Sequence, residues 1–226
     1  QPDIQKLLEV YGRITSSLAI EFPPQIAGLD FDAEYEYLSL DGALNRLTLY
    51  FGALKKATKS VVLLPENIRI EAVIEEPFFA APFLTTETTE GYTHLLEPNP
   101  ALILSGLYKE AFAFSLGAEV AEQLITARDI VQIQEGKRIF FLSTQKIEDP
   151  FFHSYRILER LLFEDKKKIL LQLQECGAGK VVLRYALDPK EYWKERTFFE
   201  KHLRGEKTIH LFAFDTALVC ERVVKR

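Results

Sequence analysis

Apolar residues recur at helical spacing near the start of the chain. Over residues 4–18 they fall on one helical face, while Glu9 and Arg13 lie four positions apart on another. The pattern predicts a helix that ends before the paired prolines Pro23 and Pro24. The apolar positions of this predicted helix are Ile4, Leu7, Leu8, Tyr11, Ile14 and Leu18.

The spacing changes to alternation over residues 33–51, which is typical of strands. Two alternating stretches flank Asp41-Gly42, a dipeptide that favours tight turns because glycine accepts a positive φ. We predict a β-hairpin here and two further strands, at 60–64 and 68–73. Residues 1–75 are thus expected to be a helix and strands from the edge of a larger sheet. We expect the helix, or a neighbouring chain, to cover the apolar strand surface.

Periodicity is lost over the next stretch, which contains Pro77, Pro82 and a run of Thr and Glu residues. We therefore predict a connector at 76–91 between a first unit, 1–75, and a second unit, 92–226. The aromatic residues of this connector are expected to pack against another part of the protein. They are Phe78, Phe79 and Phe83.

The second unit is expected to begin with a strand at 92–96 and a helix at 100–116. Asn99 is a favourable N-cap, and Pro100 suits the first helical position because its missing N–H has no partner there. The helix is apolar nearly all round, which predicts burial. A short helical turn at 118–124 and a strand at 138–143 follow.

The last third of the chain alternates between strand and helix patterns. Strands are predicted at 155–163, 180–187, 208–214 and 217–224, with helices at 164–176 and 189–203. This β-α-β-α-β-β order indicates a small α+β sheet with both helices on one face.

Composition limits the class of protein. The chain has 226 residues, 47% of them hydrophobic and 27% charged, which is typical of a folded globular protein and excludes disordered and collagen-like chains. The most apolar stretch, 101–116, is interrupted by Lys109 and Glu110, so no membrane span is predicted. Only Cys176 and Cys220 are present, which favours reduced thiols in a cytoplasmic protein. Because the chain lacks methionine and starts with Gln1, we expect a processed product or a fragment.

Charge is distributed unevenly. Residues 1–150 carry 12 Lys and Arg against 22 Asp and Glu, whereas residues 151–226 carry 16 against 11. A basic C-terminal third is compatible with phosphate contacts and equally with solvated lysines on ordinary helices. The candidate nucleic-acid-binding residues are Lys166, Lys167, Lys168, Arg184, Lys190, Lys194 and Arg196, and the candidates for stacking on bases are Tyr185, Tyr192 and Trp193.

Recognisable catalytic motifs are missing from the sequence. It contains no glycine-rich phosphate loop after a strand, no G-x-S-x-G and no H-E-x-x-H. The histidines stand alone, without neighbours at metal-ligand spacing, so we assign no catalytic residue and no metal site. They are His94, His153, His202 and His210.

The segment 94–107, HLLEPNPALILSGL, resembles the start of the THUMP-like domain that follows the catalytic domain in a family of bacterial class I S-adenosylmethionine-dependent methyltransferases. The family pattern there is tyrosine-glutamate-proline-aspartate-proline-alanine, then apolar residues, then alanine-glycine-leucine. The similarity covers residues 92–226. It continues through 155–159, Phe163, the helix from Lys166, Arg184, Asp188-Pro189 and 203–205.

Residues 33–65 also look like the end of the catalytic domain in that family. The carrying features are the acidic-aromatic stretch 34–37, the Asp41-Gly42 turn and the Tyr50-Phe51-Gly52 strand end. The resemblance implies a fold class of α/β (α+β) type, with edge strands and a helix of a Rossmann-like methyltransferase sheet followed by a ferredoxin-like or THUMP-like domain. In the family, the glycine-rich cofactor loop and the catalytic motif lie upstream. The resemblance therefore implies S-adenosylmethionine as cofactor of the full-length protein, and none for this chain.

Two functional hypotheses follow. In the first, the chain is the C-terminal portion of an RNA methyltransferase, and the THUMP-like domain helps to present RNA to an upstream catalytic domain. In the second, it is a docking or homo-oligomerisation module with no nucleic-acid role. Whether the basic residues form one contiguous surface distinguishes the two.

Overall fold

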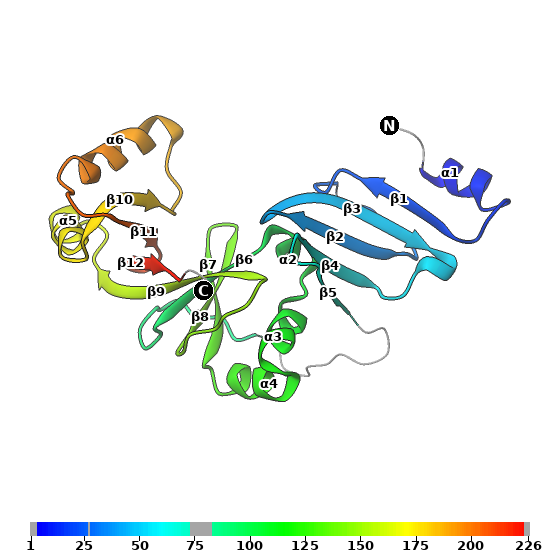
Figure 1. The fold of residues 1–226 in the computed structure, drawn as a ribbon, viewed down its shortest axis with the longest axis horizontal. Helices are drawn as coiled ribbons and strands as arrows, with labels where there is room; N and C mark the ends of the chain where they lie inside the picture. The colour runs from blue at the N-terminus through cyan, green and yellow to red at the C-terminus, as the bar shows by residue number, and fades with distance from the viewer. Residues whose placement is uncertain (1–3, 27, 73–82, 224–226) are drawn as a thin grey trace. The chain divides into compact units, whose positions relative to one another are not determined.

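The computed structural model describes residues 4–26, 28–72 and 83–223. The chain divides into two compact units, each of which is described by itself. The first comprises residues 1–80 and 99–122, and the second residues 81–98 and 123–226. Figure 1 shows the elements of both units.

The first unit is built on a five-stranded sheet with the order β1-β3-β2-β4-β5. The predicted hairpin is confirmed, because β2 and β3 pair antiparallel around Asp41 and Gly42, whose φ angles are 51° and 77°. β2 and β4 pair in parallel, and the other neighbours are antiparallel. The strands are β1 (Leu18–Phe22), β2 (Glu34–Leu40), β3 (Ala43–Phe51), β4 (Lys59–Leu64) and β5 (Ile68–Glu71), with a 3-10 turn at Gly52–Leu54.

The N-terminal helix is shorter than its apolar pattern predicts. α1 (Ile4–Tyr11) ends before Gly12, residues 12–17 form turns and bends in place of the rest of the predicted helix, and β1 begins at Leu18. Ile14 is 76% exposed and stands on no buried helical face. Residues 18–22 pair with the edge of β3, which satisfies backbone groups that would otherwise be unpaired at the sheet edge. A long-range pairing thus overrides the local periodicity.

The expectation that this helix covers the first sheet is wrong, because no residue of α1 is buried. Residues 22–26 and 28–33 cover one face instead, and their apolar side chains pack with Leu47 and Leu49. The opposite face carries a charged network in which Arg69 binds Glu34 and Glu36. Glu34 is 1% exposed and also accepts hydrogen bonds from the backbone of Lys56 and from Ser60. This face is therefore polar rather than an apolar surface in need of a cover.

The apolar helix predicted at 100–116 is divided in two. α2 (Pro100–Ser105) ends at Gly106, whose φ is 76°, and α3 (Tyr108–Leu116) starts after Leu107. Its expected all-round burial is also wrong, since Phe114 is 51% exposed. The Asn99 cap is confirmed, because its side chain accepts from the Ala101 amide.

The division into units differs from the predicted one. α2 packs against β2, β3 and β4, and α3 against β5, so residues 99–122 group with the first unit. α4 (Ala118–Thr126) follows where a short turn was predicted. Residues 76–82 of the predicted connector lie outside the described residues, as do Phe78 and Phe79, whereas 83–91 is described and forms no helix and, apart from one isolated bridge at Thr85, no strand. Phe83 is described, and its ring packs edge-on against Phe141 at 4.9 Å.

The second unit is built on a seven-stranded sheet with the order β10-β11-β12-β9-β6-β8-β7. Six of these strands overlap predicted ones, whereas β7 was not predicted. Only β10 and β11 pair in parallel. The strands are β6 (His94–Pro98), β7 (Ile130–Glu135), β8 (Arg138–Ser143), β9 (Phe152–Leu161), β10 (Ala178–Leu183), β11 (Lys207–Ala213) and β12 (Ala217–Arg222).

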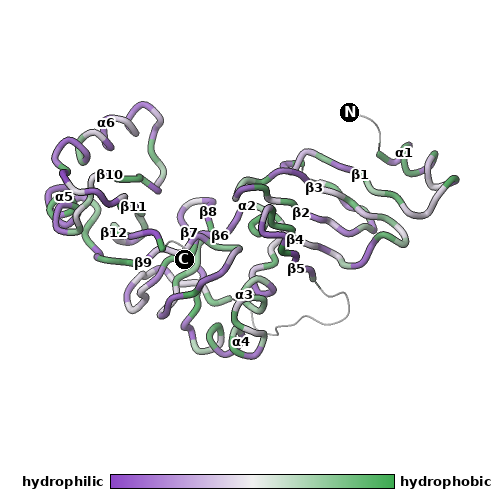
Figure 2. The backbone as a smooth tube through the Cα atoms, viewed as in Figure 1, coloured by the Kyte–Doolittle hydropathy of each residue, from purple (hydrophilic) through white to green (hydrophobic). Residues whose placement is uncertain are grey.

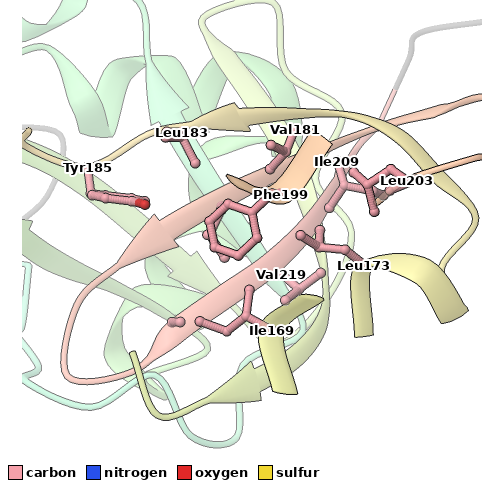
Figure 3. Close-up of a cluster of buried hydrophobic side chains, with 12 residues drawn as sticks. Ile169, Leu173, Val181, Leu183, Tyr185, Phe199, Leu203, Ile209 and Val219 are labelled. Carbon is pink, nitrogen blue, oxygen red and sulfur yellow. The ribbon is translucent and has the colours of Figure 1, made fainter. Parts of the chain in front are cut away.

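Both predicted helices of the last third pack on one face of this sheet, as expected. α5 (Lys166–Glu175) contributes Ile169 and Leu173, and α6 (Pro189–Glu200) contributes Phe199. Figure 3 shows these side chains meeting Val181, Ile209 and Val219 from the strands. In Figure 2 the tube of α5 carries both hydrophilic and hydrophobic colours, as an amphipathic helix should.

The predicted α+β class is confirmed by two mixed sheets with packed helices. The element order β9-α5-β10-α6-β11-β12 is also the one that the sequence predicts. It differs from the β-α-β-β-α-β order of ferredoxin-like domains in placing its two consecutive strands last.

Candidate nucleic-acid interface

The three consecutive lysines lie in the first turn of α5 and point away from its buried face. Asp165 caps this helix by accepting a hydrogen bond from the Lys168 amide. Lys168 also pairs with Asp165 at 3.3 Å, and Lys166 pairs with Glu195 of α6 at 2.7 Å. The repulsion between lysines and the positive end of the helix dipole is therefore offset by neighbouring carboxylates.

Two of the three predicted basic residues of α6 are also matched with carboxylates. Lys194 pairs with Glu191 at 3.2 Å, and Arg196 pairs with Glu200 at 3.0 Å. Arg196 further lies over the Trp193 ring, 5.5 Å from its centroid. Among the described residues, no ion pair involves Lys167 or Lys190.

The surface of the two helices is close to electrically neutral overall. Its six predicted cations are accompanied by six carboxylates in the same turns and caps. These carboxylates are Glu164, Asp165, Asp188, Glu191, Glu195 and Glu200. Surface pairs of this kind contribute little to stability, but they lower the net field that a phosphate would experience.

Arg184 lies apart from the helical lysines. It follows β10, and its guanidinium lies near Glu97 at 3.7 Å and donates to the Tyr155 hydroxyl at 3.2 Å. Tyr155 in turn donates to Glu97 at 2.9 Å. Arg184 also donates to His210 Nδ1 at 3.4 Å. The structure thus brings six of the seven predicted residues onto α5 and α6 and places the seventh in a separate polar cluster on the sheet.

This cluster shifts the pKa of its buried members. Burial, together with the positive charges of Arg184 and Arg222, lowers the pKa of His210 to about 4. Burial and the nearby Glu97 carboxylate raise the pKa of Tyr155 far above its usual range. His210 is therefore a neutral hydrogen-bond acceptor at pH 7, and Tyr155 is a protonated donor.

Hydrogen bonds of this cluster also link β7 and β8, at one edge of the seven-stranded sheet, to the residues that follow β10 at the other edge. Arg138 of β8 binds Glu97 at 3.2 Å and donates to the backbone carbonyl of Arg184, beyond the far edge strand β10. Glu135 of β7 accepts from the Ala186 amide at 3.1 Å. Sequence reasoning missed this group, because its members are separated by up to about half of the chain. The available signal was a polar residue on a buried strand face, such as His210 among the apolar positions of β11.

The predicted stacking residues have different environments. Tyr185 is a core residue, 9% exposed, with its ring edge-on to Phe163. Tyr192 packs against the core of α5 and α6, whereas Trp193 is 65% exposed. Of the three, Trp193 alone presents an open aromatic surface.

Other kinds of site are not found in the described part of the chain. No group of three or more His, Cys, Asp or Glu side chains is arranged to hold a metal ion there. Cys176 and Cys220 are both free thiols, and the latter is fully buried in β12. No helix among residues 4–26, 28–72 and 83–223 is long and apolar enough to cross a membrane.

Comparison with known proteins identifies a shared fold. No protein-family model and no curated protein matches the chain. It is similar to a crystal structure from Porphyromonas gingivalis W83 described as a "putative methyltransferase", with a TM-score of 0.60 and 17% sequence identity. The similarity covers 97% of this chain and 54% of that one, so this chain spans about half the length of its structural neighbour. At this identity the likeness establishes the fold.

Proposed function

We propose that this chain is the C-terminal portion of an S-adenosylmethionine-dependent methyltransferase that acts on RNA. In this proposal the second unit is a THUMP-like domain that helps to bind the RNA substrate. The observation that carries the enzyme class is the fold similarity over 97% of the chain to a protein described as a methyltransferase. The EPNPA segment at 97–101 and the Gly106-Leu107 pair support the same family from sequence.

The RNA part of the proposal depends on the basic residues of α5 and α6. Lys167 and Lys190 are exposed, and Trp193 offers an aromatic face beside Arg196. Such a surface can contact phosphates without reading sequence and can stack on an unpaired base. The upstream catalytic domain would supply the cofactor site and the reacting groups.

Salt-dependent binding tests this proposal. Changing Lys166, Lys167 and Lys168 together to Ala should weaken binding of a short single-stranded RNA, since these side chains would no longer displace counterions. The slope of log affinity against log salt should decrease by up to about 2, because each lost phosphate contact on a single strand contributes about 0.7. Fluorescence anisotropy of labelled RNA measures both quantities.

The matched control changes three lysines of the first unit, Lys6, Lys55 and Lys56, to Ala, which removes the same charge elsewhere. RNA binding should then keep its affinity and slope. Identical behaviour of the two triple variants would contradict a specific role for α5. The ion pairing of Lys166, Lys168, Lys194 and Arg196 favours the second candidate function, a docking or homo-oligomerisation module without nucleic-acid binding. Absence of RNA binding at low salt would support that alternative.

A further inference from the structure

A pocket of about 280 Å³ lies on the second unit, beside the start of β6, the middle of β9 and the end of β12. Cross-strand register explains how its central residues meet. His94 of β6 is opposite Arg156 of β9, and Arg156 is opposite Glu221 of β12, so the three side chains share one face of the sheet. The pocket is lined by His94, Lys146, Arg156, Glu221, Arg222 and Val223.

The pocket has a net positive charge, unlike the surface of α5 and α6. Three permanent cations line it against one carboxylate, Glu221. That carboxylate is shared by Arg156 at 2.7 Å and by Lys207 at 3.1 Å. Lys146 pairs with Glu148 outside the lining. When the flanking residues Lys207 and Glu148 are counted as well, cations exceed carboxylates by two.

Within the part of the chain that the structure describes, the guanidinium groups keep donors for a ligand. Arg156 contacts Glu221 through Nη2, and Arg222 contacts His153 Nδ1 through Nη2 at 2.9 Å. Each guanidinium has five N–H donors in a planar fork, which matches the oxygens of a phosphate.

The positive field reaches His94. Burial, followed by the charges of Arg156 and Lys146, lowers the pKa of this imidazole. The groups that face it are Thr93, whose hydroxyl lies 2.9 Å from Nδ1, Lys146, Arg156 and the Glu221–Arg222 end of β12. An imidazole in this position reports on any anion that enters the pocket.

We propose that this pocket is a phosphate-binding site, formed by Lys146, Arg156 and Arg222 around His94. None of these residues belongs to the predicted interface on α5 and α6. The site does not depend on the proposed function, because its chemistry suits both a phosphodiester of RNA and a free phosphate.

Titration with inorganic phosphate tests the site directly. NMR of the His94 ring, assigned by the signal lost in His94→Gln, should show a shift on phosphate addition and a rise in the His94 pKa as the anion offsets the two cations. Arg156→Gln should weaken phosphate binding roughly ten-fold, the effect of losing one charge-assisted bidentate contact.

Glu221→Gln is the matched variant with the opposite expected effect. It keeps the shape of the side chain and removes the carboxylate that competes for Arg156, so phosphate should bind several-fold more tightly. The triple Ala variant at Lys166, Lys167 and Lys168 should bind phosphate like the wild type. Unchanged His94 signals, or equal phosphate affinity in Arg156→Gln, Glu221→Gln and wild type, would overturn the site even if RNA binds elsewhere.

A second titration with short single-stranded RNA distinguishes the two phosphate sources. Weaker RNA binding by Arg156→Gln supports a phosphodiester contact. If phosphate binds and RNA does not, the pocket is supported as a site for free phosphate, and the proposed RNA function fails separately. Loss of RNA binding in the α5 triple variant alone, without a His94 response to phosphate, would refute the pocket and support the α5 interface.

Discussion

At the scale of single residues, the basic side chains of this protein have different surroundings. The lysines on α5 and α6 are exposed and Arg196 is partly buried, and four of these six cations are matched with acidic neighbours. Arg184 instead belongs to a partly buried network with Glu97 and Tyr155, in which each polar group has a partner. Buried polar groups need such partners because their water contacts are lost on folding. We infer that Arg184 stabilises the sheet and is not part of the basic surface on α5 and α6.

His210 makes the stability of the second unit sensitive to acid. Its pKa is about 4 in the folded chain against an ordinary 6.5. The neutral imidazole therefore makes its full contribution to the free energy of unfolding above pH 6.5. The contribution decreases as the pH falls from 6.5 toward 4, because the unfolded chain binds a proton that the folded chain does not. At pH 5 the free energy of unfolding has decreased by about 2 kcal/mol through this group. The loss of stability between pH 7 and pH 5 should therefore be about 2 kcal/mol smaller in His210→Gln than in the wild type.

Urea unfolding followed by fluorescence measures this difference, since Trp193 is the one tryptophan in the sequence and lies in the second unit. The control is His202→Gln, which makes the same substitution at an exposed position of the second unit, after α6. Parallel pH profiles for wild type and His210→Gln would contradict the role assigned to His210.

At the scale of elements, two loops cross closely beside β10. The residues after α5 and those after α6 approach through backbone atoms, with the Gly205 amide donating to the Ala178 carbonyl at 3.0 Å and the Lys207 amide donating to Gly177 at 3.1 Å. A Cβ on Gly179 would overlap the carbonyl of Gly205. The crossing sets where β11 begins to pair with β10, so it positions both helices on the sheet.

Gly179→Ala should destabilise the second unit by roughly 2 kcal/mol or more, because backbone atoms on both sides would have to move. Gly177→Ala is the control two residues away. Its φ is 73° with open space around a new Cβ, so only left-handed strain of about 1 kcal/mol is expected. Urea unfolding followed by Trp193 fluorescence compares them. Equal losses in the two variants would show that the close approach is unimportant.

At the scale of the whole molecule, the chain combines two sheets that differ in construction. The first places a charged network on one face, and the second packs α5 and α6 on one face and a separate apolar cluster, with Tyr155 and Phe212, on the other. Both sheets are covered by the structural similarity to a chain about twice as long. If the proposed function is correct, the reacting groups belong to the part of that fold outside this chain.

We predict that the 226-residue chain alone does not bind S-adenosylmethionine at micromolar concentration. Its sequence contains no glycine-rich turn after a strand, the feature that lets backbone amides approach such cofactors closely. Isothermal titration calorimetry measures this, with a methyltransferase that has such a loop as the positive control. A micromolar binding isotherm would place a cofactor site within these residues and refute the prediction.

The sequence by itself determined the elements whose signals are local. Alternation around Asp41-Gly42 predicted the β2–β3 hairpin, Asn99 predicted the start of α2, and amphipathic spacing predicted α5. These features depend on neighbours within a few positions, where turn chemistry and burial periodicity act directly.

Only the tertiary structure decided the features that depend on distant partners. Residues 18–22 became β1 because β3 offered an edge. The positive charge of the α5 lysines is compensated by carboxylates, among them Glu195 of the next helix. The pocket around His94 and Arg156 exists because β6, β9 and β12 pair in one register, which no local pattern specifies.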